Sequence, residues 1–151
     1  MSDKVKKDKH TVVGTGVLLW KASNAWQRHV REQLKSIEIT QVQFLLLDAI
    51  QQHEATGKQL TQISLSRSAG TDVMMTSKVI RAMEVQKLVV RKSSKKDARI
   101  VVLQITAEGK KKLSRAAVAM EKAESAFFSK LISKPHKFLA NLAALVEENQ
   151  G

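Results

Sequence analysis

The side chains of this 151-residue sequence that could do chemistry are mostly lysines and arginines, and they gather in one stretch. Fourteen of them lie between Lys58 and Arg115 together with four acidic residues, so this segment carries +10 of the formal net charge of +12. Cations concentrated in this way neutralise phosphates and release the counterions of a polyanion. The distribution therefore favours a surface that binds nucleic acid over a charged surface that only contacts water.

Residue types that build catalytic or metal sites are scarce in the sequence. Cysteine is absent, which excludes disulfides, thiolate zinc sites, cysteine nucleophiles and thiol redox switches. The four histidines, at positions 10, 29, 53 and 136, never pair with each other at metal-ligand spacing, so neither a metal nor another cofactor is expected. Because we also find no nucleophile–base arrangement and no glycine-rich phosphate loop, we predict that the chain is not an enzyme.

Part of the basic segment has the pattern of a helix-turn-helix. A short helix is predicted from Thr61, followed by a turn at Gly70-Thr71. A second helix begins at Asp72, a favourable N-cap, and ends near Gln86. The residues expected to bury the core face of this second helix are Met75, Val79, Ile80 and Met83.

The opposite face of the second helix would lie in the major groove of DNA. Its contact candidates are Asp72, Val73, Met74, Ser77, Lys78 and Arg81. Met74 could touch a thymine methyl group, and Thr61 and Gln62 in the first helix would meet phosphate. The same pattern also fits an αα-hairpin with a solvated face, so it does not identify a DNA-binding protein by itself.

A basic hairpin follows the second helix. Strands are predicted at residues 88–92 and 100–105, where β-branched residues are frequent, and a polar tip joins them. The contact candidates in this hairpin are Lys92, Ser94, Lys95, Lys96, Asp97 and Arg99. Asp97 could pair with Arg99 and direct its guanidinium into a narrow minor groove. The alternative is an exposed turn with an ion pair of little energetic value.

Other helices must position these elements. Helices are predicted over residues 11–37, from a capping box at Thr40–Gln43 to a loop at residues 53–59, from Thr106 onward, and from Ser133 and Pro135. The predicted fold class is mainly α with a small β-hairpin (α+β): a winged helix-turn-helix between terminal helices. No apolar run reaches the ~20 residues of a membrane span. Residues 1–10 have no signal-peptide features, so a basic disordered tail and a cytoplasmic protein are expected.

Several motifs in register resemble the MarR family of bacterial regulators. They are Ile39–Gln43 at the entry to the second predicted helix, Leu88-Val89 before the hairpin, Asp97-Ala-Arg99 at its tip and Ile105-Thr-Ala-Glu-Gly109 after it. The resemblance covers residues 11–148 in element order. Two features depart from the family pattern: Lys87 replaces a frequent glycine, which would make a left-handed helix end costly by ~1 kcal/mol, and residues 73–75 are unusually apolar.

The resemblance implies a transcriptional regulator with one domain over residues 11–151. Its DNA-binding lobe would cover residues 40–112, and the helices at 11–37 and 107–148 would form a homodimer on a palindromic operator. Many relatives bind small aromatic or phenolic ligands between the dimer helices and the DNA-binding lobe, so a ligand-responsive repressor is expected, and the ligand-pocket candidates here are Trp20, Trp26 and His29. Tryptophans at helical spacing are more often core residues than ligand contacts. The alternative functions are a non-specific architectural DNA-binding protein and a winged-helix module for protein contacts.

Overall fold

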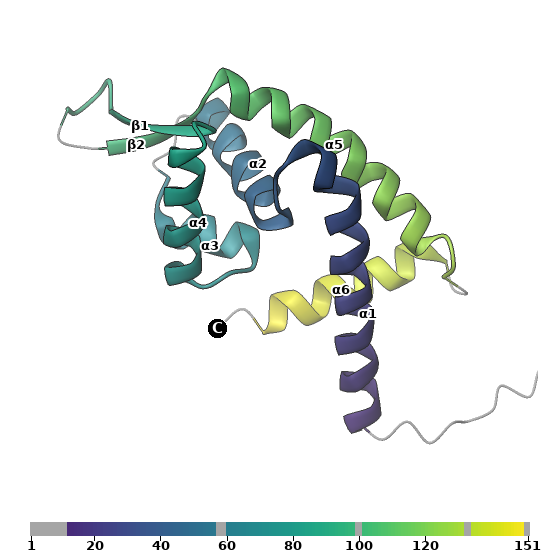
Figure 1. Ribbon diagram of the computed structural model, residues 1–151. Helices are drawn as coiled ribbons and strands as arrows, with labels where there is room; N and C mark the ends of the chain where they lie inside the picture. Colours follow the sequence, from purple (N-terminus) through teal and green to yellow (C-terminus); the bar gives the residue numbers. More distant parts are fainter. Residues whose placement is uncertain (1–11, 57–59, 99–100, 132–133, 150–151) are drawn as a thin grey trace, which may run out of the picture.

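The computed structural model describes residues 12–56, 60–98, 101–131 and 134–149, a mainly helical part of the chain with a two-stranded hairpin (Figure 1). In chain order the elements are α1 (Val12–Leu34), the 3-10 turn η1 (Lys35–Ile37), α2 (Gln41–Thr56), α3 (Gln62–Ala69), α4 (Val73–Val85), β1 (Val89–Ser93), β2 (Val101–Ile105), α5 (Ala107–Phe128) and α6 (Pro135–Glu148). The predicted fold class is confirmed. Within these ranges, no helix is both long and apolar enough to cross a bilayer.

Helix α2 supplies the centre of the hydrophobic core. Its side chains Leu46, Leu47 and Ile50 are fully buried, and each such burial contributes about 1.5–3 kcal/mol. Figure 1 shows α2 between α5 on one side and the α3–α4 pair on the other. The buried side chains from the neighbouring elements include Val30, Leu34, Leu65, Ile80, Met83, Leu88, Leu113 and Ala116. Helix α2 therefore holds the helix-turn-helix against the long α5.

Side-chain caps determine where two of these helices begin. The backbone N–H of Gln43 donates to Oγ1 of Thr40 at 3.2 Å, and the Thr40 N–H donates to Oε1 of Gln43 at 3.0 Å. This reciprocal pair confirms the predicted capping box of α2. At the start of α5, Oγ1 of Thr106 accepts from the Gly109 N–H at 3.0 Å. Each cap satisfies an N–H that the helix itself leaves unpaired, which stabilises the helix by about 1 kcal/mol.

The hairpin is anchored at its base and exposed toward its tip. Strands β1 and β2 pair antiparallel, from Val89 opposite Ile105 to Ser93 opposite Val101. Val89 and Ile105 are buried, whereas Lys92 and Ser93 are exposed. In Figure 1 the hairpin projects beyond the helices. Its base therefore belongs to the core, while its outer part is available to a partner.

Some predicted boundaries were wrong. The loop expected at residues 53–59 begins later, because α2 continues through Thr56. The carboxylate of Glu54 accepts a 2.7 Å hydrogen bond from the Ile105 N–H, and this distant contact supports the last turn of α2. The predicted helix over 11–37 ends in the tighter turn η1. Pro135 opens α6 as predicted, whereas Ser133 lies outside the described residues.

The predicted core stripe of α4 was wrong at one position. Met75 is 45% exposed, and the neighbouring Thr76 is fully buried in its place. A threonine is tolerated there because its hydroxyl is satisfied: Oγ1 donates to the Asp72 carbonyl at 2.8 Å and lies 2.7 Å from Oγ1 of Thr71. Ile80 is buried as predicted.

Candidate nucleic-acid interface

A tight turn sets α4 against α3. Helix α3 ends at Gly70, whose φ of +63° lies in the left-handed region that glycine adopts without a steric cost. The Thr71 N–H then donates to the Ser66 carbonyl at 2.9 Å. Oγ1 of Thr71 lies 2.7 Å from that of Thr76, which joins the turn to the buried face of α4. These bonds fix the angle at which α4 leaves the turn.

The outward face of α4 carries three of the six predicted base-contact residues. Thr76, Ile80 and Met83 are buried, so the opposite stripe of the helix faces solvent. This exposed stripe consists of Met74, Lys78, Arg81 and Val85. Because a recognition helix must bury one stripe and present the other to the major groove, α4 has the required two-faced character.

Three further candidates on α4 have local roles as well. Asp72 is the N-cap of α4: its Oδ1 accepts from the Met75 N–H at 2.7 Å. Val73 is exposed beside it. Ser77 is half-buried, and its Oγ accepts from Nη2 of Arg81 at a long 3.4 Å. The Asp72 carboxylate is thus used by the helix, while Arg81 keeps donors free to reach a base or a phosphate.

The phosphate-contact candidates Thr61 and Gln62 lie at the start of α3. Thr61 forms a capping box with Ser64: the Ser64 N–H donates to Oγ1 of Thr61, and the Thr61 N–H donates to Oγ of Ser64, both at 3.1 Å. Gln62 is half-buried. The positive end of the α3 helix dipole lies at this place, which suits a phosphate contact.

The wing, meaning strands β1 and β2 with the tip that joins them, presents its cations to solvent. Lys92, Lys95 and Lys96 are exposed. Ser94 is half-buried, and its Oγ accepts from the Lys96 N–H at 3.2 Å, which shapes the tip. Asp97 is half-buried as well. The remaining wing candidate, Arg99, lies outside the described residues.

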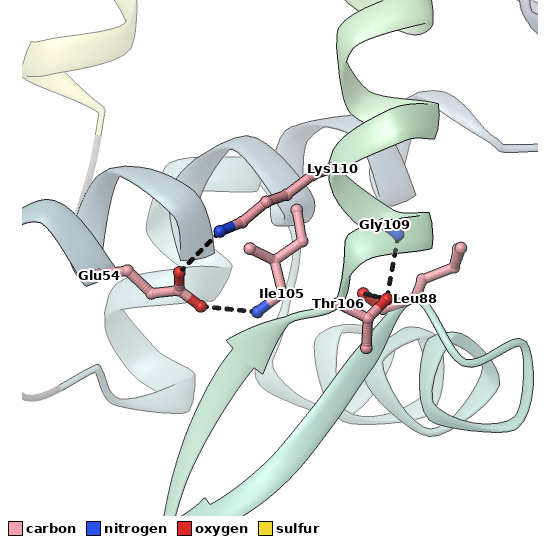
Figure 2. A network of polar contacts seen from close by, with 6 residues as sticks. All are labelled: Glu54, Leu88, Ile105, Thr106, Gly109 and Lys110. Atoms are coloured by element: carbon pink, nitrogen blue, oxygen red, sulfur yellow. Dashed lines mark hydrogen bonds and ion pairs between the residues drawn. The ribbon is translucent and has the colours of Figure 1, made fainter.

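A polar network that was not predicted anchors the base of the wing (Figure 2). Glu54 of α2 accepts from the Ile105 N–H at 2.7 Å, and its other oxygen lies 4.0 Å from Nζ of Lys110. Oγ1 of Thr106 lies 3.1 Å from the carbonyl oxygen of Leu88 and 2.7 Å from the carbonyl oxygen of Lys87. The wing is therefore held by both α2 and α5.

Gly109 belongs to the same network. A Cβ at this position would overlap the Leu88 carbonyl oxygen, so only glycine lets α5 approach the wing this closely (Figure 2). The sequence signal for this contact was the Thr-Ala-Glu-Gly run from Thr106. Glu54 had no comparable signal, since its partner Ile105 is 51 residues away in the chain.

Two side-chain contacts tie α4 to its surroundings, and neither was predicted. Nε2 of the buried Gln43 donates to Oε1 of Gln86 at 2.9 Å, which joins the start of α2 to the end of α4. Nε of Arg91 lies 2.8 Å from Oε1 of Glu84, which joins β1 to α4. The ion pair therefore joins the candidate base-reading helix directly to the candidate wing, and the amide bond joins that helix to α2.

The predicted ligand-pocket residues divide into two groups. Trp20 is 69% exposed, and it lies six residues from Trp26, so the two point to different sides of α1. Trp26 packs against Phe127 and Phe128 of α5, with ring centroids 5.3 and 5.4 Å apart. His29 joins this cluster at 6.4 Å from Trp26, and its Nε2 is buried without a hydrogen-bond partner among the described residues.

The aromatic cluster borders a hollow between the end of α5 and α6. The hollow has a volume of about 680 Å³ and is lined mainly by apolar side chains, including Phe128, Leu131, Phe138, Leu139 and Leu142. Phe128 thus belongs both to the cluster and to the wall of the hollow. Within the described ranges, no group of three or more His, Asp or Glu side chains comes together in a way that could hold a metal ion.

This arrangement of helices and hairpin is similar to that of known DNA-binding regulators. The MarR family model matches residues 39–101, which include the helix-turn-helix. The uncharacterized HTH-type transcriptional regulator YdcH of Bacillus subtilis is 36% identical over 132 residues, which span 87% of this chain and 89% of that protein. The structure of the S. aureus MepR–DNA complex aligns with a TM-score of 0.75 at 20% identity, over 95% of this chain and 99% of that one.

A further solved structure, of Bordetella bronchiseptica BpsR, concerns regulation of DNA binding by 6-hydroxynicotinic acid. It aligns with a TM-score of 0.74 at 18% identity, over 90% of this chain and 93% of that one. At such identities the structural matches show the shared fold, whereas the YdcH match extends over nearly the whole chain. The chain therefore belongs to the MarR family of winged helix-turn-helix, DNA-binding transcriptional regulators.

Proposed function

We propose that this regulator is a repressor that binds a palindromic operator as a homodimer and releases it when a small aromatic effector binds. The observation that carries the proposal is the stripe of exposed side chains on α4, which includes Lys78 and Arg81, next to a wing with Lys92, Lys95 and Lys96 exposed. One surface thus offers side chains to base edges and cations to phosphates, the two kinds of contact that sequence-specific binding requires.

Homodimerisation is supported by apolar surface on the terminal helices. None of the described α6 residues is buried, although Leu139, Leu145 and Val146 are large and apolar. On α1, Val17 and Trp20 are also exposed. Exposed apolar patches of this kind mark interaction sites. In a two-fold dimer the same patch of both copies meets, so each copy covers the apolar side chains of the other. We expect sedimentation equilibrium to give a dimer at micromolar concentration, and Leu145→Glu, which does not line the hollow between α5 and α6, to shift it toward monomer.

Two-fold symmetry and repression follow from the dimer. A two-fold protein meets two-fold DNA, so the operator should be an imperfect palindrome with half-site centres about one helical turn, ~34 Å, apart. A dimer that occupies adjacent major grooves, with a wing outside each one, blocks access of polymerase where the operator overlaps a promoter. This steric exclusion requires no additional activity, which favours repression.

The aromatic cluster and the hollow beside it support a small aromatic effector. A volume of about 680 Å³ lies within the range of small-molecule sites, and Phe128 offers a ring face to a planar ligand. Trp26 does not line the hollow but packs on Phe128, which does, so its fluorescence reports on a ligand bound there. We expect 6-hydroxynicotinic acid or benzoate to quench Trp26 fluorescence in a Trp20→Phe variant, in which Trp26 is the sole tryptophan. Unchanged fluorescence with both acids would argue against an aromatic effector here.

The decisive experiment is selection of bound sequences from random duplex DNA with the full-length protein. We expect enrichment of one palindrome. Lys78→Ala or Arg81→Ala should then weaken binding to it by about 1–3 kcal/mol if the side chain contacts a base. Lys122→Ala is the matched control, because it removes the same charge from the exposed side of α5. Salt-sensitive binding without any enriched sequence would instead indicate an architectural DNA-binding protein.

A further inference from the structure

The exposed stripe of α4 begins and ends with an apolar side chain. Met74 in the first turn is 85% exposed, and Val85 in the last turn is 82% exposed. Lys78 and Arg81 lie between them on the same stripe. The two apolar side chains are eleven residues apart, a separation of ~16 Å along the helix, so they cannot touch the same base step. Each end of the stripe therefore meets a different environment when α4 binds DNA.

The first turn of α4 is apolar on more than one side. Val73 and Met75, which flank Met74, are 42% and 45% exposed. A large apolar side chain left in water gains free energy when a partner covers it, at roughly 25 cal/mol per Å². In helix-turn-helix proteins, the N-terminal residues of the recognition helix are the ones that contact base edges. The first turn is thus the part of α4 that a base pair would cover.

The surroundings of Met74 indicate what kind of partner covers it. Lys78 follows one turn later on the same stripe, and Arg67 is exposed on α3, the other helix of the motif. The segment from Lys58 to Arg115 carries a net charge of +10. An apolar contact within such a cationic surface suits a polyanion that offers an apolar group, rather than the apolar face of another protein.

Duplex DNA offers one apolar group of this kind in its major groove, the C5-methyl of thymine. Methionine matches it, because its thioether chain is unbranched, flexible and polarizable and carries no hydrogen-bond donor. It therefore gains from contact with a methyl group but cannot satisfy the donors and acceptors of the other base edges. A methionine covered by a guanine or cytosine edge would leave those groups unpaired, which is unfavourable.

We propose that Met74 reads the C5-methyl group of a thymine in each half-site, so that the operator is selected for thymine at that position. This role rests on the proposed function, since it requires α4 to lie in the major groove of a preferred sequence. Val85 lies beyond the base-reading part of the helix and has no such role.

The test replaces thymines of the selected operator by deoxyuridine, which keeps base pairing and removes only the methyl group. Each thymine is replaced symmetrically in both half-sites, and the affinity is measured for the wild type, Met74→Ala and Val85→Ala. At one position, loss of both methyl groups should weaken wild-type binding roughly fifteenfold, or roughly fourfold for each methyl. Met74→Ala should bind the thymine and deoxyuridine duplexes equally, while Val85→Ala should keep the wild-type discrimination.

Thermal unfolding shows whether the variants keep the fold. Met74 and Val85 are both so exposed that truncation should leave the unfolding midpoint nearly unchanged. A selection that enriches no sequence would overturn the proposed function itself. An enriched half-site that lacks thymine, or that tolerates deoxyuridine at every thymine, would overturn only the role of Met74. The role of Met74 would also be overturned if Met74→Ala still bound the thymine duplex more tightly than the deoxyuridine duplex, or if Val85→Ala no longer distinguished the two.

Discussion

Nε of Arg91 in strand β1 lies 2.8 Å from Oε1 of Glu84 in α4, and this ion pair joins the two elements proposed to contact DNA. Both side chains are partly exposed, so the pair contributes little to folding stability. We propose that the pair acts at the DNA interface instead: it would orient the wing relative to α4 and hold Arg91 so that it does not bind phosphates indiscriminately. We infer that the pair favours specific over non-specific binding.

Glu84→Gln should therefore lower specificity more than stability. We expect the free energy of unfolding to change by less than about 1 kcal/mol. Affinity for random duplex DNA should rise, because a negative charge is lost near phosphate and Arg91 is released to bind it. The ratio of specific to non-specific affinity should fall several-fold, as measured by fluorescence anisotropy at fixed salt. Glu121→Gln on α5 makes the same charge change away from the wing, and an equal effect of both variants would contradict the role of the pair.

Gly109→Ala should destabilise the protein. The added methyl group would overlap the Leu88 carbonyl oxygen, which also accepts a 3.0 Å hydrogen bond from the Thr106 N–H. Relief requires α5 to move away from the wing, so we expect a loss of about 1–3 kcal/mol in urea unfolding. Gly16→Ala is the control: the methyl group that it adds on α1 has open space around it, and alanine should stabilise that helix by up to ~1 kcal/mol. Two variants of equal stability would show that the wing base is not tightly packed.

Lys87→Gly should stabilise the protein. Lys87 follows the end of α4 with φ of +58°, and the N–H of Leu88 returns to the Met83 carbonyl at 2.9 Å. A side chain in the left-handed region costs ~1 kcal/mol, which glycine removes. Chemical denaturation should therefore show a gain of about this size. Gln86→Gly should have the opposite sign, because Gln86 has φ of −75° and bonds to Gln43. A loss of stability in Lys87→Gly would refute the strain argument.

The sequence predicted what depends on nearby residues. The capping box of Thr40, the N-cap Asp72 and the turn at Gly70 all follow from contacts within a few residues, and the structure contains each of them. The strain at Lys87 was expected from the family resemblance, because the family often has glycine there, and φ of Lys87 is positive as that implied. The order of helices and strands follows from hydrophobic period and turn residues, which are local signals as well. Local chemistry was therefore enough to identify the helix-turn-helix and the wing.

What the sequence missed depends on how side chains pack in three dimensions. Glu54 extends α2 by binding the backbone of Ile105, and no pattern near residue 54 indicates this. Thr76 is buried instead of Met75 because its hydroxyl finds partners in the turn, whereas hydrophobicity alone favours the methionine. Trp20 and Trp26 were named as ligand-pocket candidates from the family resemblance, and six positions along a helix turn the two to different sides. The DNA contacts themselves remain predictions.

Two predictions concern the tip of the wing. We expect Arg99, which lies outside the described residues, to enter the minor groove beside each half-site, with Lys95 and Lys96 at the flanking phosphates. Arg99→Ala should weaken operator binding and leave thermal unfolding nearly unchanged, because a tip residue buries little surface. Fluorescence anisotropy and thermal unfolding on the same preparation check both parts. If Arg99→Ala and the wild type bound the operator with equal affinity, Arg99 would not be a DNA contact.

Asp97→Ala separates orientation from simple charge. Loss of a negative charge near DNA should tighten binding by reducing repulsion from phosphate. If Asp97 directs Arg99, its loss should weaken binding instead, because the arginine must then be ordered at an entropic cost. We expect the weakening to prevail and to grow with salt, since salt screens the charge effect while the ordering cost stays. Asp97→Asn, which keeps the shape but not the charge, should fall between. Tighter binding by Asp97→Ala across the salt range would show that Asp97 only repels the phosphates.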